Sequence, residues 1–418
     1  MPALHAGEET EDSAVTGPPL LTEPEDGVPF VVESARGLER AVAALEAGSG
    51  PVAVDAERAS GFRYGQRAFL VQLKREGSGL WLIDPEPFDT LVPLQRALGG
   101  AEWILHAASQ DLPCLAELGM HPHALFDTEL AARLAGLPRV GLGAVVEALL
   151  GFRLAKEHSA ADWSKRPLPQ DWLRYAALDV ELLVPLRDEL RRLLGEQSKL
   201  DWAEQEFEHV RTHRPQAVPR EDRWRKTSGV NKLKSPRKLA VLRELWRARE
   251  SLAESRDVSP GHVLPDSALV AAADALPRTV PQLLQVPGFH GRAAKREGPR
   301  WLRAVQAGTS SSDLPERTRR GGAPPPPRTW KDRNPTAFRQ YRTARAWLEN
   351  RAEELEMMPE TLLTPAVLKQ LCWEPPEPAD LETVSSRLEE LGARPWQLEQ
   401  TAAIVTVALL DPDPLDSL

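Results

Sequence analysis

Carboxylates in three short stretches of this 418-residue chain could hold divalent metal ions. In the first stretch, VAVDAE, Asp55 and Glu57 lie two residues apart, so on a β-strand both side chains point to the same face. Two adjacent carboxylates repel each other unless a cation lies between them, and Mg²⁺ and Mn²⁺ prefer carboxylate oxygens. An exposed strand end that leads into a polar loop would also explain the pair.

The second stretch, ILHAASQD, predicts a strand that ends at about His106 and then turns into a helix. Asp111 falls in the first turn of that helix. An acid at this position commonly compensates the helix dipole, so helix stabilisation is the competing explanation for Asp111. His106 is interpreted as a structural residue at the strand end.

The third stretch, RYAALDVELLVPL, spans residues 174–186 and has the leucine spacing of an amphipathic helix. Tyr175 and Asp179 lie four residues apart, so they share one face of that helix. With the first two stretches, the set comprises four carboxylates and one phenol. A phosphoryl-transfer site with two metal ions about 4 Å apart requires such a set of carboxylates.

Alternating strand and helix patterns surround these residues in the first half of the chain and indicate an α/β domain. Residues from about 170 onward are predicted to be helical. Strands are expected at 51–57, 67–74, 79–84 and 101–108, and helices at 38–48, 89–100 and 111–119.

Composition shifts divide the chain into six segments. The two helical units have similar length and element order, which makes a diverged internal repeat plausible. The segments are an acidic disordered tail at 1–27, the α/β domain at 28–210, a basic linker at 211–227, a helical unit at 228–308, a Pro/Gly/Arg-rich linker at 309–335 and a second helical unit at 336–413.

The bulk composition excludes several classes of protein. The N-terminus lacks the basic start and apolar core of a signal peptide, and no apolar run is long enough to span a membrane. Cys114 and Cys372 are the only cysteines, so neither a disulfide framework nor a structural zinc site is expected. We therefore expect a cytoplasmic protein.

A basic stretch follows the acidic first half: residues 209–249 contain 13 Lys and Arg against 3 Asp and Glu. Such clustering favours a polyanion-binding surface, although a solvated helical segment is the alternative. Arg243 and Arg247 would share a helix face and repel each other unless an anion lies between them. The candidate phosphate-binding residues are Lys232, Lys234, Arg237, Lys238, Arg243 and Arg247.

The motifs VAVDAE, LHAASQDL and YAALD, in this order, resemble those of the ribonuclease D family, in the tyrosine branch of the DEDD superfamily of 3′–5′ exonucleases. The similarity runs from about 30 to 200 and includes LIDP, FDTELAARLAG and KEHSAADWSKRPLPQDWLRYAALDV. The unit at 228–308 resembles the HRDC domain, and the C-terminal unit looks like a second, more divergent one. No P-loop motif is present, so a helicase motor is not expected.

This resemblance implies an α/β ribonuclease H-like exonuclease domain, a mixed sheet flanked by helices, followed by two all-α HRDC-like domains. Two positions depart from the family pattern: Ala56 replaces a common threonine, and Arg58 stands where an aromatic or apolar residue is usual. Neither change removes a metal ligand. The two departures leave open how the terminal base of a nucleic-acid substrate packs near the stretch RASGFRYGQR.

The resemblance also implies the reaction: hydrolysis of the 3′-terminal phosphodiester of RNA, with two divalent ions, Mg²⁺ or Mn²⁺, as cofactors. Asp55 would bridge both ions, Glu57 and Asp179 would complete the first site, and Asp111 would hold the second. Tyr175 is too weak an acid to ionise readily, so its expected role is to orient the attacking water.

The expected partner is the single-stranded 3′ end of RNA, with pre-tRNA trimming as the role that the family suggests and a monomer as the favoured state. Two alternatives remain open from the sequence. The enzyme could act on DNA, or the chain could be a non-catalytic nucleic-acid-binding protein on a nuclease scaffold.

Overall fold

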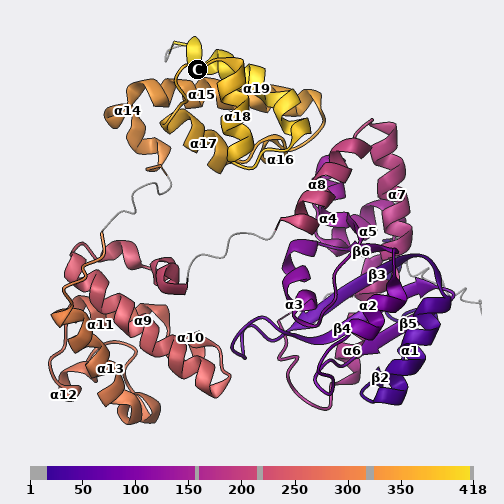
Figure 1. Ribbon diagram of the computed structural model, residues 1–418, viewed down its shortest axis with the longest axis horizontal. Helices are drawn as coiled ribbons and strands as arrows, with labels where there is room; N and C mark the ends of the chain where they lie inside the picture. Colours follow the sequence, from indigo (N-terminus) through magenta and orange to yellow (C-terminus); the bar gives the residue numbers. More distant parts are fainter. Residues whose placement is uncertain (1–16, 156–159, 214–219, 317–323, 415–418) are drawn as a thin grey trace, which may run out of the picture.

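The computed structural model describes residues 17–155, 160–213, 220–316 and 324–414, which form three units (Figure 1). The first unit contains the sheet, and the other two are helical. Residues 1–16 of the acidic tail predicted at 1–27 lie outside the described residues.

The first unit is built on a six-stranded mixed sheet with the strand order β2-β5-β4-β3-β6-β7. β3 pairs antiparallel with β4 and parallel with β6, so the strand that carries VAVDAE lies inside the sheet. The predicted mixed sheet is thus confirmed. Its strands are β2 Val31–Val32, β3 Ser49–Arg58, β4 Ala68–Glu76, β5 Gly79–Ile83, β6 Glu102–Leu105 and β7 Ala124–Asp127.

The alternation of side chains along β3 and β4 gives the sheet two different faces. On one face, Val54 and Val71 belong to the main hydrophobic core of this unit. On the other face, Leu70 and Leu82 form a smaller core with Leu173 of helix α6 Gln170–Glu181, which packs across β3, β4 and β5. Helix α6 therefore covers the face to which Asp55 and Glu57 point.

Further helices complete the first unit and pack around the sheet (Figure 1). They are α1 Ala35–Ala47, α2 Val92–Leu98, α3 Leu112–Glu117, α4 Thr128–Leu134, α5 Leu142–Leu150, α7 Leu183–Glu196 and α8 Leu200–Thr212.

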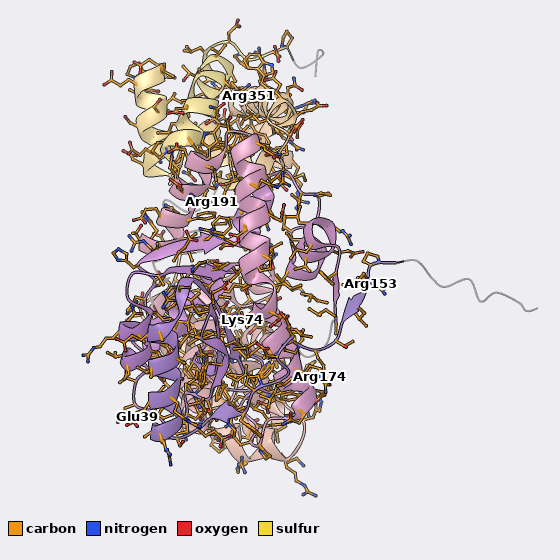
Figure 2. All side chains as sticks on the ribbon, turned by 90° about the vertical axis from the view of Figure 1, so that its right-hand side faces the viewer. Glu39, Lys74, Arg153, Arg174, Arg191 and Arg351 are labelled. Carbon is orange, nitrogen blue, oxygen red and sulfur yellow. The ribbon has the colours of Figure 1, made fainter. Side chains whose placement is uncertain are left out.

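The described end of the predicted acidic tail is ordered. Strand β1 Leu20–Leu21 pairs in parallel with β8 Arg153–Leu154, and Arg153 is labelled in Figure 2 at the edge of this unit. The backbone N–H of Glu25 donates to Glu181 of α6. Backbone pairing with a segment more than a hundred residues later in the chain orders residues that are acidic and Pro-rich, so the tail prediction is wrong for this part.

The second unit begins earlier than predicted. Residues 220–226, placed in the basic linker at 211–227, form the 3₁₀-helix η2 Arg220–Lys226, and Trp224 is only 1% exposed in the core of this unit. Burial of a tryptophan ring stabilises this segment against the helices that follow. They are α9 Pro236–Arg256, α10 Pro260–Val263, α11 Asp266–Ala275, α12 Val280–Leu283 and α13 Arg292–Ser310. The 3₁₀-helix η3 Val230–Lys232 precedes them.

The third unit also begins inside a predicted linker, because Trp330 is fully buried in its core. It follows the same order of a long helix, short helices and a closing helix as the second unit. Its elements are η4 Pro327–Thr329, α14 Trp330–Arg333, α15 Pro335–Glu354, α16 Pro359–Leu362, α17 Pro365–Trp373, α18 Leu381–Glu390 and α19 Pro395–Leu410.

The third unit packs against α8 of the first through hydrogen bonds to the Glu206 carboxylate and through stacked tryptophan rings. Glu206 accepts hydrogen bonds from Arg394 at 2.6 Å and from the indole N–H of Trp396 at 2.7 Å. The rings of Trp202 and Trp396 stack with their centroids 4.9 Å apart. Hydrogen bonds between charged groups that are largely shielded from water are strong, so they stabilise this contact between the two units.

No helix in the described part of the chain is long and apolar enough to cross a membrane. Cys114 and Cys372 are both buried and free.

Candidate active site

Three of the predicted carboxylates meet at one point of the first unit. Asp55 and Glu57 come from β3 and Asp179 from α6, and each offers an oxygen that lies within 4.8 Å of the others. Glu57 is buried, whereas Asp55 and Asp179 are half-buried. The cluster therefore has the hard oxygen donors that Mg²⁺ or Mn²⁺ requires and an opening to solvent.

The stretch at 174–186 is two helices instead of the predicted one. Helix α6 ends at Glu181, Leu182 has φ −104° and ψ 6°, and α7 begins at Leu183. The break lets α6 follow the sheet while α7 leaves along β3 and β6. Only the α6 part of the leucine pattern holds Tyr175 and Asp179 over the strands.

Tyr175 and Asp179 interact as their spacing predicts, through a hydrogen bond between the phenol and the carboxylate. Burial, followed by the negative charge of Asp179, raises the pKa of the Tyr175 phenol far above its ordinary value. The hydroxyl therefore stays protonated at any physiological pH. It can position a hydrogen-bonding partner but cannot act as a base.

Asp111 lies beside the trio but outside its tight cluster. It precedes α3 and makes no side-chain hydrogen bond to the helix N-terminus, so helix capping does not explain it. Its carboxylate, which is buried, pairs instead with the guanidinium of Arg58 at 3.3 Å. The unusual arginine of the first motif thus supplies a cation next to four carboxylates.

Burial and mutual repulsion make these acids hard to ionise. The pKa of Asp55 is raised to about 6, chiefly by burial, and that of Asp111 to about 8 by burial and by the charge of Asp55. The pKa values of Glu57 and Asp179 lie well above their ordinary range for the same two reasons. Such a crowded acidic site is the environment that a bound cation relieves.

Asp127 is a positioning residue that the sequence interpretation missed. Its buried carboxylate accepts hydrogen bonds from the backbone N–H groups of Ala107 and Ala108, at 3.1 and 2.8 Å. Ala107 has φ +59°, a left-handed conformation that requires such support. Asp127 thereby fixes the turn that carries Asp111. Its N-cap position ahead of TELAARL was the available signal.

The basic stretch of the second unit is largely paired with acidic and carbonyl groups of the same chain. Arg243 is 9% exposed and pairs with Asp313 at 2.8 Å, and Glu244 is the anion beside Arg243 and Arg247.

Lys238 pairs with Asp274 at 2.6 Å, and Arg237 donates to the carbonyls of Gly308 and Ser311. Lys232 and Lys234 are exposed and form no ion pair with any residue in the described ranges. These two lysines are the predicted phosphate-binding residues that combine an exposed side chain with no acidic partner among the described residues.

The second unit contacts the loop that follows Glu57. Asp257 accepts hydrogen bonds from the guanidinium of Arg67, at 3.1 and 3.3 Å, and from the backbone N–H of Tyr64. The backbone N–H of Ser259 donates to the carbonyl of Phe62 at 2.9 Å. The stretch RASGFRYGQR, which follows the strand that carries the acidic pair, is thus held from the second unit.

Comparison with known families agrees with this geometry. A family described as 3′–5′ exonuclease matches residues 29–195, the HRDC domain matches 238–305, and a family described as 3′ to 5′ exonuclease C-terminal domain matches 323–409. The ribonuclease D of Pseudomonas paraeruginosa is 32% identical over 314 residues, 73% of this chain and 79% of that protein. The chain belongs to the ribonuclease D family.

Other relatives and solved structures point the same way. The ribonuclease D of Nitrobacter hamburgensis is 33% identical over 213 residues, 50% of this chain and 54% of that protein. A crystal structure of a protein from Bifidobacterium adolescentis is 37% identical, with a TM-score of 0.85, and covers 94% of this chain and 100% of that one.

Escherichia coli RNase D, described as an exoribonuclease involved in structured RNA processing, is 26% identical with a TM-score of 0.66, covering 87% of this chain and 98% of that one. The family assignment confirms the predicted exonuclease fold with its helical HRDC region, and it confirms a hydrolytic 3′–5′ exonuclease. The alternative of a non-catalytic scaffold is thereby set aside.

Proposed function

We propose that this ribonuclease D-family enzyme shortens single-stranded 3′ ends of RNA one nucleoside 5′-monophosphate at a time, at a site for two divalent ions held by Asp55, Glu57, Asp111 and Asp179. The convergence of Asp55, Glu57 and Asp179 within 4.8 Å, from a strand and a helix far apart in the sequence, carries this proposal. Mg²⁺ and Mn²⁺ both suit such oxygen donors.

Asp55 is the carboxylate best placed to be shared by two ions. Its charge is the strongest electrostatic influence on the pKa values of Glu57, Asp111 and Asp179. Asp55 is therefore the carboxylate that interacts with all three of the others. This supports one ion between Asp55, Glu57 and Asp179, and another between Asp55 and Asp111.

Tyr175 and Arg58 have separate roles beside the metal ions. Bound divalent ions would supply positive charge to the phosphodiester and lower the pKa of water. Tyr175 keeps its proton and, tied to Asp179, presents a hydroxyl that orients the attacking water. Arg58 offers a guanidinium at the same site, with the fork of donors that phosphate oxygens accept.

The substrate is a nucleic acid, and we propose RNA, with trimming of tRNA precursors as the biological role. This rests on the similarity to the ribonuclease D relatives over most of their length. Because no described side chain can be assigned to a ribose 2′-OH, DNA is the alternative that the experiment must address.

The test is digestion of matched RNA and DNA oligonucleotides with single-stranded 3′ tails and a 5′ label, in Mg²⁺, in Mn²⁺ and in EDTA. We expect a metal-dependent ladder that shortens from the 3′ end of RNA, with release of 5′-monophosphates, and no ladder with Asp55→Asn. Faster cleavage of DNA would contradict the RNA assignment. Activity in EDTA, or in Asp55→Asn, would contradict the metal site.

A further inference from the structure

Gln72, in the middle of β4, is a buried amide without a partner. Gln72 is 0% exposed. Neither the oxygen nor the nitrogen of its side-chain amide has a hydrogen-bond partner in the described part of the chain. The buried glutamines of the third unit behave differently. The amides of Gln340 and Gln397 donate to the carbonyls of Leu409 and Thr361, at 2.7 and 3.0 Å.

The register of the sheet places Gln72 beside the acidic cluster. β4 runs antiparallel to β3, and Gln72 lies directly opposite Asp55. Side chains of such a cross-strand pair point to the same face, with Cβ atoms about 5 Å apart. Gln72 and Asp55 therefore both point to the face that α6 covers, where Asp179 completes the cluster.

The other neighbours of Gln72 on this face offer little to an amide. Leu70 lies two residues before it, and Leu82 lies opposite it on β5. Lys74, two residues after it and labelled in Figure 2, is already paired with Glu181 of α6 at 2.7 Å. The polar groups nearest in register are the carboxylates of Asp55 and, diagonally, Glu57.

Stability does not explain an amide at this position. A buried polar group without a hydrogen bond costs stability, whereas an apolar side chain of the same shape is neutral or stabilising. Glutamine and methionine have nearly the same length and volume. A fold that needed only packing at position 72 would be served better by methionine.

We propose that Gln72 is a positioning residue of the metal site: when a metal ion is bound, its amide N–H donates to the Asp55 carboxylate and holds that ligand in the metal-binding orientation, whereas in EDTA the amide stays unpaired. This inference rests on the proposed function of the acidic cluster. The hydrogen bond needs only rotation about the side-chain bonds of Gln72, because the two residues are already cross-strand neighbours. Residues that hydrogen-bond to metal ligands, without touching the metal, typically contribute about 10- to 100-fold to metal affinity or activity.

The experiment compares Gln72→Met with Gln397→Met in the full chain, with two readouts: thermal unfolding in EDTA and Mn²⁺ affinity by electron paramagnetic resonance. We expect Gln72→Met to unfold at or above the wild-type temperature and to bind Mn²⁺ about 10- to 100-fold more weakly. Gln397→Met, which loses satisfied hydrogen bonds, should unfold earlier and bind Mn²⁺ normally.

Wild-type Mn²⁺ affinity in Gln72→Met would overturn the inference, and so would a large loss of stability in both Gln72→Met and Gln72→Leu. Failure of the underlying site has a different signature. In that case wild-type protein and Asp55→Asn would bind Mn²⁺ equally, whatever residue stands at position 72.

Discussion

Replacing Asp55 by asparagine should stabilise the protein in EDTA while it abolishes activity. Burial raises the pKa of Asp55 from 3.8 to about 6, so the folded protein holds this proton more tightly than the unfolded chain. Ionising Asp55 at higher pH therefore costs stability, about 1.4 kcal/mol for every tenfold difference in proton affinity between the two states. The cost is on the order of 3 kcal/mol above pH 6, and asparagine removes it.

The pH dependence identifies the cause. Below about pH 4 Asp55 is protonated in both folded and unfolded protein, so wild type and Asp55→Asn should unfold at similar temperatures. As the pH rises from about 4 through 6, the wild type loses more stability than the variant, which lacks the Asp55 carboxylate, and at about pH 8 the variant should unfold roughly 5–10 °C higher. Thermal unfolding in EDTA across this pH range measures the difference, with Asp89→Asn as the control because Asp89 is exposed.

Added Mg²⁺ should reverse the order. The wild type gains stability from binding by mass action, whereas the variant has lost a ligand. Two results would refute the reasoning. One is a difference in unfolding temperature that is the same in acidic and alkaline buffer, and the other is near-normal exonuclease activity of Asp55→Asn.

Three further predictions concern neighbouring groups. Tyr175→Phe should lower the turnover rate by about 10²-fold or less and leave Mn²⁺ affinity unchanged; an unaltered rate would exclude an orienting role. Arg58→Leu should destabilise the protein in EDTA more at about pH 9 than at about pH 6. The pKa of Asp111 is about 8, and its carboxylate needs the Arg58 guanidinium only when it is ionised. Equal decreases in unfolding temperature at both pH values would argue against this pairing. Changing Lys232 and Lys234 together to glutamine should make the slope of log binding constant against log salt concentration less steep, by about 0.7 for each phosphate that the protein no longer neutralises. Fluorescence anisotropy of labelled RNA at several salt concentrations measures this slope. An unchanged slope would show that these lysines contact no phosphate.

Local patterns in the sequence were enough to predict the five candidate site residues and the periodicity of the elements that carry them. The period of two along β3 puts Asp55 and Glu57 on one face, and the helical period puts Tyr175 one turn from Asp179. These relations depend only on backbone geometry between near neighbours. They hold wherever the element lies in the fold.

Interactions between distant segments decided the rest. Arg243 is neutralised by Asp313, which lies 70 residues later in the chain. Parts of the two predicted linkers belong to the helical units instead, because Trp224 and Trp330 are buried there. That Gln72 is buried without a hydrogen-bond partner, directly opposite Asp55, follows only from the pairing of β4 with β3. Ion pairing, burial and unsatisfied hydrogen bonds are properties of assembled surroundings, because they arise between residues that no local period brings together.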